Sequence, residues 1–543
     1  RITAERMRRF WISVIDFQSC FFCRRELDSF GHTFRLSICR KSTPLLARTC
    51  FEIFKALPFA FLSSSSACRY TQNNSVPMLP TTPEYFCFLV LVFFAYWLLV
   101  RVRVTGLALI CVANYFFYAK WGFIYLLLVP IASTVDYLIG RLLATTNSLA
   151  LRRLLLGVSV CSNVGLIISC KYVPRFAGAF GHWTGTPIHI EGWVLPLGLS
   201  FYAFQAMTYT FDVYRRDTKP ITNYLAYIAS VSFFPTTLAG PITRVTALSP
   251  QWLKRVRLTD EDGGRALFLI GLGLFKKFLI ADYLGENLVN RVFDLPTLYS
   301  GGDVLVAVYA YAFQLYYDFS GYTDIAIGSA LLLGIKLPIN FNGPYKAQNI
   351  ADFWRRWHIS LSNWLRDYLY FSFPGKRTKV GPYIAIIITF AIGGAWDDAN
   401  WAFLVWGFLH GLGLAIFRGW QAIRGNRNRV GSRWGRAAGI IVTFHFILFA
   451  WIFFRASSID TALQILSQIA SLKYSFDNTH ANFLLVLAIG AAAHWTPKNW
   501  YDHSVHWFSR QPVYVQAAAL TVVAFTIQYV ASTGAAPFIY TKF

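Results

Sequence analysis

Long apolar runs constrain the fold of this chain more than any other feature. Three of them are FCFLVLVFFAYWLLV (86–100), LFLIGLGLF (267–275) and GPYIAIIITFAIGG (381–394). Hydrophobic residues make up 55% of the 543 residues and charged residues only 14%, compared with about a quarter charged in soluble proteins. Near-continuous apolar runs of about 20 residues suit membrane-spanning helices and differ from the alternating pattern of an outer-membrane barrel. The sequence therefore predicts an all-α, polytopic integral membrane protein.

Apolar spans recur between residues 86 and 531, and they are separated by glycines, prolines and basic clusters. Some of the spans are short, and some suit re-entrant segments. We therefore expect about eleven to thirteen helices and no separate soluble domain.

The positive charges lie in short segments between the apolar runs. The formal net charge is +24, and examples of basic segments are RVR (101–103), LKRVR (253–257) and RGWQAIRGNRNRVGSRWGR (418–436). Short basic loops of this kind mark the cytoplasmic side of an inner-membrane protein. The pattern predicts a multi-pass protein of the bacterial inner membrane, in contact with membrane lipids. It argues against nucleic acid as a partner, because no basic face lies outside this membrane context.

The first 77 residues differ from the rest of the chain. They start with Arg1, contain SSSS (63–66) and hold five of the nine cysteines, without a clear periodicity. Met78 then opens a short polar lead into the first apolar run. We expect residues 1–77 to be an atypical N-terminal extension that is not part of the native protein, and residues 78–543 to form the membrane domain. The cysteines form no paired motif of metal-site spacing, so we expect no bound metal.

The segment 350–377 stands apart from the apolar spans. Its apolar residues recur at i, i+3, i+4 and i+7, and its arginines occupy other faces. This spacing predicts an amphipathic helix that lies in the membrane interface, with tryptophans at headgroup level and His358 on it.

Several motifs resemble the bacterial polysaccharide branch of the membrane-bound O-acyltransferase (MBOAT) family, which includes the membrane subunit of alginate O-acetyltransferase. They follow the order found in that family and extend from Met78 to Phe543. The motifs are LPLGLSFYAFQAMTYTFDVYR (195–215), FFPTTLAGPITR (233–244), GLFKKFLIADYL (273–284), YYDFSGYTDIAIG (316–328), NFNGPY (340–345), FWRRWHISLSNWLRDYLY (353–370), WIFFRA (451–456) and FIYTKF (538–543).

The resemblance implies an MBOAT fold with interfacial or re-entrant helices around a central tunnel. It implies that an acetyl or other acyl group passes from a cytoplasmic donor, acetyl-CoA or another acyl-CoA, toward hydroxyls of an extracytoplasmic polysaccharide. It also implies a periplasmic or membrane-anchored partner acetyltransferase. No bound cofactor is expected. D-alanyl transferases for teichoic acid and peptidoglycan acetylases share the broad family and remain alternatives.

The chain departs from the family at the position of the catalytic histidine. Family members carry a W-H-G-A-[NS]-W-like motif, with a second histidine thirteen residues after the first in W-G-x-x-H-G. Here GGAW (393–396), ANW (399–401) and WGFLHG (406–411) align without a gap, and His410 matches the second histidine. Asp397 and Asp398 replace the first histidine and the glycine that follows it.

Three interpretations of this departure stay open. The chain is a degenerate paralogue that serves as a membrane scaffold, or it retains activity with changed residues, or the sequence itself is in error there. In the second case the base is Asp397, His410 or His358, since carboxylates and histidines both serve as general bases. We also expect donor or tunnel roles for a wider set of residues: Arg355, Arg356, Arg366, Asp318, Asp324, Trp396 and Asn400.

Overall fold

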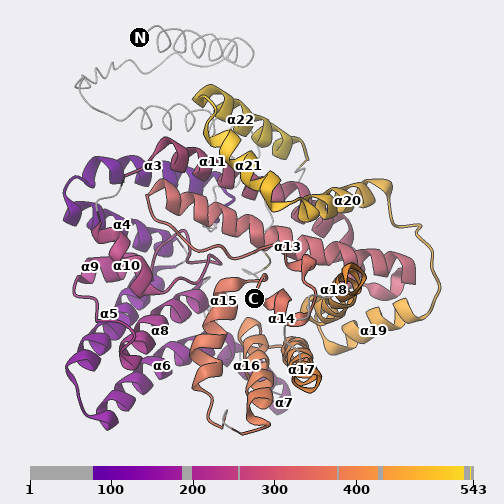
Figure 1. Ribbon diagram of the computed structural model, residues 1–543, viewed down its shortest axis with the longest axis horizontal. Helices are drawn as coiled ribbons and strands as arrows, with labels where there is room; N and C mark the ends of the chain where they lie inside the picture. The colour runs from indigo at the N-terminus through magenta and orange to yellow at the C-terminus, as the bar shows by residue number, and fades with distance from the viewer. Residues whose placement is uncertain are drawn as a thin grey trace. The chain divides into compact units, whose positions relative to one another are not determined.

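The computed structural model describes residues 78–120, 122–185, 198–254, 257–375, 378–425, 432–530 and 539, which all belong to one compact unit. Helices and the turns between them account for these ranges, in agreement with the predicted all-α class (Figure 1). The predicted N-terminal extension, residues 1–77, lies outside the described residues.

The N-terminal half is a bundle of apolar helices. Helices α5, α6 and α8 pack against one another, and α4 joins α3 to this group (Figure 1). The helices of this half are α3 (Pro83–Leu99), α4 (Arg103–Ala119), α5 (Phe123–Thr145), α6 (Leu149–Lys171), α7 (Val173–Thr184), α8 (Leu199–Arg215), α9 (Tyr224–Val231) and α10 (Val245–Leu253).

Two long elements cross the middle of the molecule. Helix α11 (Asp260–Phe275) continues into π-helical turns at Lys276–Asp282 and Gly285–Val289, then into α12 (Asn290–Asp294), and it packs along α13 (Gly301–Leu332). The backbones of α11 and α13 approach closely, because a Cβ atom at Gly321 would lie 2.8 Å from the carbonyl oxygen of Gly273. Only glycine fits this crossing without displacing its neighbour.

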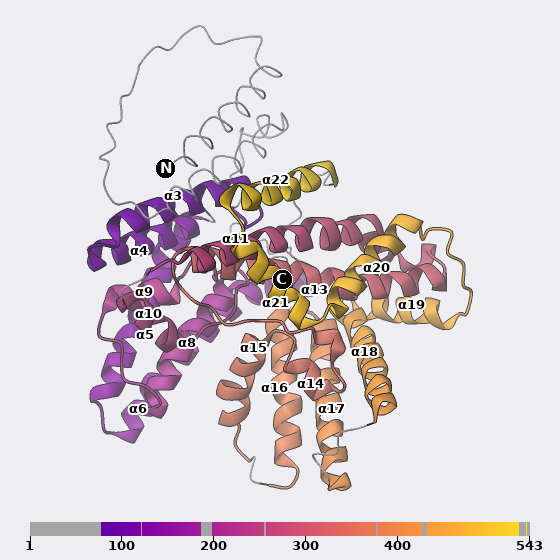
Figure 2. The same ribbon diagram turned by 45° about the horizontal axis from the view of Figure 1, so that its top comes forward.

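The C-terminal half carries the second group of helices. Helices α16, α17 and α18 run side by side (Figure 2). A Cβ atom at Gly411 of α17 would lie 2.8 Å from the Cα atom of Ile387, so α16 and α17 also meet through glycine. The helices are α16 (Gly381–Asp397), α17 (Trp401–Arg424), α18 (Arg433–Arg455), α19 (Ile459–Ala470), α20 (Ala481–Trp495), α21 (Lys498–Ser509) and α22 (Val513–Val530).

The prediction of one continuous helix over 350–377 is wrong. The segment forms two short helices, α14 (Ile350–Trp354) and α15 (Ile359–Trp364), followed by a π-helical turn at Leu365–Leu369. His358 breaks the helix with a φ of 40°, in the left-handed region. The N–H groups of Ile359 and Ser360 donate to the backbone and side-chain oxygens of Asn340, so a distant segment supplies the acceptors that the helix would have supplied.

The prediction that the tryptophans of this segment lie at headgroup level is also wrong, because they pack inside the protein. The six residues that carry the periodic pattern are all buried: Trp354, Trp357, Leu361, Trp364, Leu365 and Tyr368.

Four of the described helices have the length and apolar composition needed to cross a bilayer: Leu126–Thr145, Leu149–Lys171, Trp401–Arg424 and Arg433–Arg455. The pair Lys498–Ser509 and Val513–Tyr529, bent by 120°, adds a fifth if it counts as one broken span. Four shorter apolar helices accompany them, at Pro83–Leu99, Arg103–Ala119, Gly381–Asp397 and Ala481–Trp495. The multi-pass membrane character is therefore present, while the count of eleven to thirteen stays a prediction.

Candidate active site

The two aspartates lie at the turn between α16 and α17. Asp397 is the last residue of α16 and is only 4% exposed, and the carboxylate of Asp398 accepts a hydrogen bond of 2.8 Å from the N–H of Ala399. Asn400 caps α17, because its side-chain oxygen accepts from the N–H of Ala402 at 3.1 Å. Its amide nitrogen donates to the carbonyl of Ser457 at 2.8 Å. Asn400 thus has a structural role that the sequence did not reveal.

Side chains from α6 and its C-terminal end hold the C-terminal end of α16. The ammonium of Lys171 donates to the carbonyl of Asp397 at 2.5 Å and to the carbonyl of Trp396. The hydroxyl of the next residue, Tyr172, donates to the carbonyl of Ala395 at 2.5 Å. These carbonyls belong to the last turn of α16, where backbone acceptors lack partners within the helix. The N-terminal bundle therefore fixes the position of the aspartate turn.

Trp396 lies between Lys171 and two phenylalanines of α8. Its ring stacks on Phe204 with centroids 4.6 Å apart and meets Phe201 edge-on at 5.7 Å. The ammonium of Lys171 lies 5.8 Å from the Trp396 ring centroid. The indole nitrogen of Trp396 is buried without a hydrogen-bond partner in the described part of the chain. A donor in this state can bind a ligand oxygen at no cost in lost protein contacts.

His358 contacts one of these α8 rings, Phe201. Its ring stacks on Phe201 with centroids 6.3 Å apart and meets Phe319 edge-on at 4.6 Å. Nδ1 of His358 lies 3.1 Å from the side-chain oxygen of Asn340, which also accepts from the hydroxyl of Ser360 at 2.9 Å. The structure thus brings Trp396, the neighbour of Asp397, and His358 to one phenylalanine ring.

His410 lies in a separate aromatic cluster. It is buried on α17, and Trp354 donates to its Nδ1 at 3.2 Å. Nδ1 is therefore the acceptor, so the neutral ring carries its proton on Nε2, which has no hydrogen-bond partner among the described residues. The rings of Trp406 and Phe390 lie 5.0 and 6.5 Å from that of His410.

Helix geometry separates His410 from Asp397. His410 is nine residues after Trp401, the first residue of α17, which corresponds to a rise of about 13 Å. The residue of α16 that faces it is Phe390, seven positions before Asp397. Asp397 and His410, thirteen residues apart in the sequence, therefore lie at different levels along the helix pair α16 and α17.

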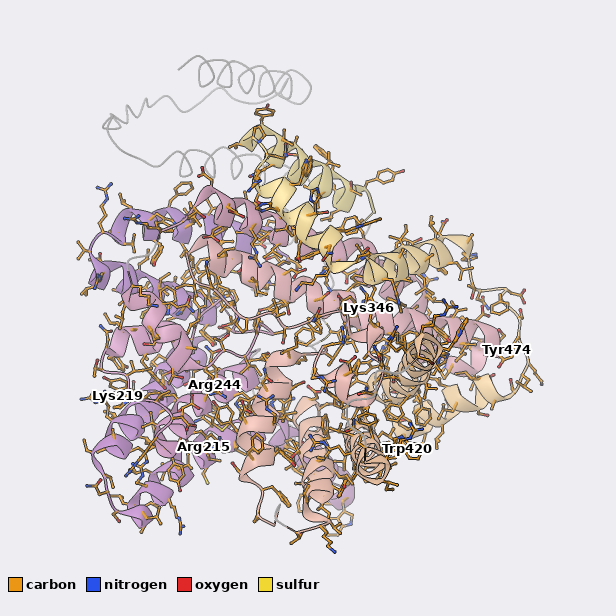
Figure 3. All side chains as sticks on the ribbon, viewed as in Figure 1. Arg215, Lys219, Arg244, Lys346, Trp420 and Tyr474 are labelled. Carbon is orange, nitrogen blue, oxygen red and sulfur yellow. The ribbon has the colours of Figure 1, made fainter. Side chains whose placement is uncertain are left out.

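A cavity of about 410 Å³ opens beside this aromatic layer. Its wall includes Ser360, which contacts the Asn340 oxygen that His358 also contacts, and Trp364, whose ring stacks on Phe204. Charged groups on the wall are Arg244 (labelled in Figure 3), Lys336 and Asp367. Arg244 pairs with Asp367 at 2.6 Å. One residue thus connects the cavity wall to each group: Asn340 connects it to His358, and Phe204 connects it to Trp396.

The sequence profile of the membrane-bound O-acyltransferase family, MBOAT, matches residues 84–459. The chain belongs to the MBOAT family. The family resemblance of the sequence is thereby confirmed, and the cavity, the aspartate turn and both histidine clusters fall within the matched range.

Three relatives of this MBOAT chain are named for different activities. A peptidoglycan O-acetyltransferase of Helicobacter pylori is 35% identical over 455 residues, 79% of this chain and 80% of the relative. A protein named probable alginate O-acetylase AlgI of Azotobacter vinelandii is 37% identical over 365 residues, 65% of this chain and 70% of the relative. A teichoic acid D-alanyltransferase of Streptococcus thermophilus is 29% identical over 291 residues, 48% of this chain and 68% of the relative.

The three predicted donor-binding arginines of the MBOAT chain do not line the cavity. Arg355 and Arg356 both pair with Asp352, at 3.4 and 3.1 Å, and Arg366 pairs with Asp367 at 2.7 Å. The cavity wall contains Arg244 instead, which the sequence offered only as part of the motif FFPTTLAGPITR. The donor roles of the three predicted arginines stay predictions.

Asp318 and Asp324 of α13 are ion-paired. The ammonium of Lys277 lies 2.7 Å from carboxylate oxygens of both Asp318 and Asp282, and that of Lys276 lies 2.6 Å from Asp324. The N–H of Ile539 donates to the second oxygen of Asp318 at 2.8 Å. The lysine pair of GLFKKFL therefore compensates the buried acids, and the tunnel role predicted for them remains a prediction.

Lys171 is the residue that sequence reasoning missed. The available signal was a single lysine directly after the apolar run 154–170.

Proposed function

We propose that this MBOAT protein transfers an acetyl or other acyl group from a cytoplasmic acyl-CoA to hydroxyls of an extracytoplasmic, alginate-like polysaccharide. It would do so in the bacterial inner membrane, together with a periplasmic or membrane-anchored acetyltransferase. Family membership and the relatives named as O-acetylases support the reaction class. The observation that carries the proposal is the cavity, whose wall residue Ser360 shares the Asn340 oxygen with His358 and whose wall residue Trp364 is linked through Phe204 to Trp396.

The chemistry needs two groups. A base takes the proton of the acceptor hydroxyl while the hydroxyl oxygen bonds to the carbonyl carbon of the thioester. A hydrogen-bond donor stabilises the resulting oxyanion until the C–S bond breaks and the departing thiolate takes up a proton. Asp397 is our candidate for the base, because it occupies the family position of the catalytic group. The unpartnered indole N–H of Trp396 is a candidate oxyanion donor. Exclusion of water from this aromatic layer limits hydrolysis of the acyl donor.

The cationic groups at the cavity suit a phosphate-bearing donor. Arg244 and Lys336 lie on the cavity wall, and Arg215 lies nearby, since it donates to the carbonyl of Asp367 at 2.7 Å (Figure 3). Guanidinium groups bind phosphate oxygens through charge-assisted hydrogen bonds. The basic segment 253–257 follows α10, in keeping with a cytoplasmic position for this side of the protein.

Peptidoglycan is a second candidate acceptor. The peptidoglycan O-acetyltransferase of Helicobacter pylori matches 79% of this chain, a larger share than the 65% matched by the alginate O-acetylase relative. A non-catalytic scaffold for a partner acetyltransferase is the alternative of another class, and the substitution at Asp397 favours it.

One complementation experiment separates these functions. A deletion strain receives this protein, its Asp397→His/Asp398→Gly version or an empty vector, and the O-acetyl content of exopolysaccharide and of peptidoglycan is measured. We expect acetylation from the native chain, in one polymer only. Acetylation from the reverted version alone would identify the native chain as a degenerate scaffold. If the native chain is active, loss of activity in His410→Ala but not in Asp397→Asn assigns the base to His410.

A further inference from the structure

Lys171 joins two parts of the chain that are distant in sequence. It is the last residue of α6, in the N-terminal bundle, and it contacts the last residues of α16, more than 220 positions later. Of the charged side chains of the described residues, Lys171 is the cation whose hydrogen bonds reach the carbonyls of Trp396 and Asp397.

The first role of Lys171 is to hold backbone. The carbonyls of Ala395, Trp396 and Asp397 are the orphaned acceptors of the α16 terminus, and a cation there also suits the negative end of the helix dipole. Tyr172 alone reaches only the first of these carbonyls. Without Lys171, the carbonyls of Trp396 and Asp397 would lose these hydrogen bonds, and the backbone that carries the Asp397 and Asp398 side chains would be held less firmly.

Its second role concerns charge. The Lys171 ammonium lies 2.5 Å from the carbonyl oxygen of Asp397, which places its charge within electrostatic range of the side chains of Asp397 and Asp398. Two adjacent carboxylates in an apolar setting repel each other and lose hydration, and one nearby cation offsets part of both costs. A histidine and a glycine at these positions, as in the family motif, would not need this cation for charge balance.

We propose that Lys171 is the positioning residue of the Asp397–Asp398 turn: it aligns the turn through two carbonyls and offsets the charge that the aspartate substitution introduced. The inference deepens the proposed function, on which its activity arm rests. The inference adds α6, a helix of the N-terminal bundle, to a site whose motifs all lie in the C-terminal half of the chain.

Activity tests the positioning role. Acetyl transfer is measured in membranes that contain Lys171→Met, Lys171→Arg or the control Lys120→Met, with protein amounts equalised. Lys120 also follows the end of an apolar helix, but its side chain is exposed, with the ammonium 5.5 Å from the centroid of the Phe116 ring. We expect about 10- to 100-fold loss in Lys171→Met, because small misplacements of a reacting group cost that much. Lys171→Arg should retain most activity and Lys120→Met all of it.

The charge role is tested by making Lys171→Met both in the native chain and in a chain without the two aspartates. In the Asp397→His/Asp398→Gly background, Lys171→Met should lose a smaller factor of activity than in the native background, because only the carbonyl contacts are lost there. An equal factor in both backgrounds would overturn the charge role. An inactive but folded Lys171→Arg variant would overturn the positioning role as well.

A stability cycle tests the inference even if the native chain proves inactive. The melting temperatures of the full-length protein in detergent are compared for Lys171→Met, Asp397→Asn/Asp398→Asn and the combination. We expect Lys171→Met to lower the melting temperature by several degrees in the native chain and by less than half that amount in the Asn/Asn background. Additive shifts would overturn the charge role, and no shift in either background would overturn the positioning role. Non-additive shifts in a chain without acetylation would support it while refuting the proposed function.

Discussion

The ring of Phe204 stacks on that of Trp364 with centroids 4.0 Å apart and planes 8° apart. The same phenylalanine stacks on Trp396 at 4.6 Å, so one side chain of α8 links the wall of the cavity to the aspartate turn. Aromatic stacks of this kind add to the free energy of burial and restrict the rings to one arrangement.

Truncation of this linking ring should impair both stability and transfer. Phe204→Ala is expected to cost about 3–5 kcal/mol of stability, because it leaves a cavity between two tryptophans. Phe204→Leu keeps most of the volume but not the stack, so it should fold and still lose acetylation. Phe525→Leu on α22, at a ring that is 51% exposed, is the control. Full acetylation in a folded Phe204→Leu protein would remove the stack from the site.

The cavity can be tested by filling it. Ala247 lines the cavity and its side chain is exposed, so Ala247→Trp narrows the space without disturbing a packed core. We expect a higher KM for the acyl-CoA and an unchanged maximal rate, measured as transfer of labelled acetyl groups in membranes. Ala150→Trp, at an exposed position of α6, is the matched control. An unchanged KM would mean that the donor enters elsewhere.

The ion pairs of α13 predict a strong dependence on Lys277. Lys277→Met leaves the buried carboxylate of Asp318 without its cation, and loss of one partner of a buried pair costs about 3–5 kcal/mol. We expect little protein in the membrane and a lowered melting temperature for what remains. Arg355→Met removes a largely exposed pair, for which the expected cost is about 0–1 kcal/mol. Similar losses in the two variants would contradict the structural role of the Lys277 pair.

The crossing of α11 and α13 predicts a specific glycine requirement. In Gly321→Ala the added methyl group would lie 2.8 Å from the carbonyl oxygen of Gly273, and such overpacking costs about 1–3 kcal/mol. Gly157→Ala on α6 meets nothing within 4 Å and gains helix propensity. Thermal unfolding in detergent should therefore show a fall for the first variant and no fall for the second.

The sequence predicted the helices around the site better than the contacts between their side chains. The apolar run 381–394 predicted a helix before the aspartates, and the structure has it as α16, which ends at Asp397, with His410 on the next helix, α17. Local periodicity at 350–370 marked the residues of one face, but that face packs inside the protein and not against lipid headgroups. It could not show the break at His358, because the acceptors that cause it belong to Asn340, eighteen residues away. Lys171 escaped notice for the same reason, since its partners lie in the other half of the chain.

The way in which the aspartate turn is held has a consequence for how this chain can change. Lys171 and Tyr172 donate hydrogen bonds to the backbone carbonyl oxygens of residues 395–397, which are present whatever the side chains at these positions. These backbone contacts are therefore the same for any side chain at position 397, and the Lys171 charge is an additional benefit to an aspartate there. A histidine, an aspartate or another reactive group can be exchanged there by point mutation with the same backbone support, which makes position 397 a place where new chemistry can be tried without a new fold.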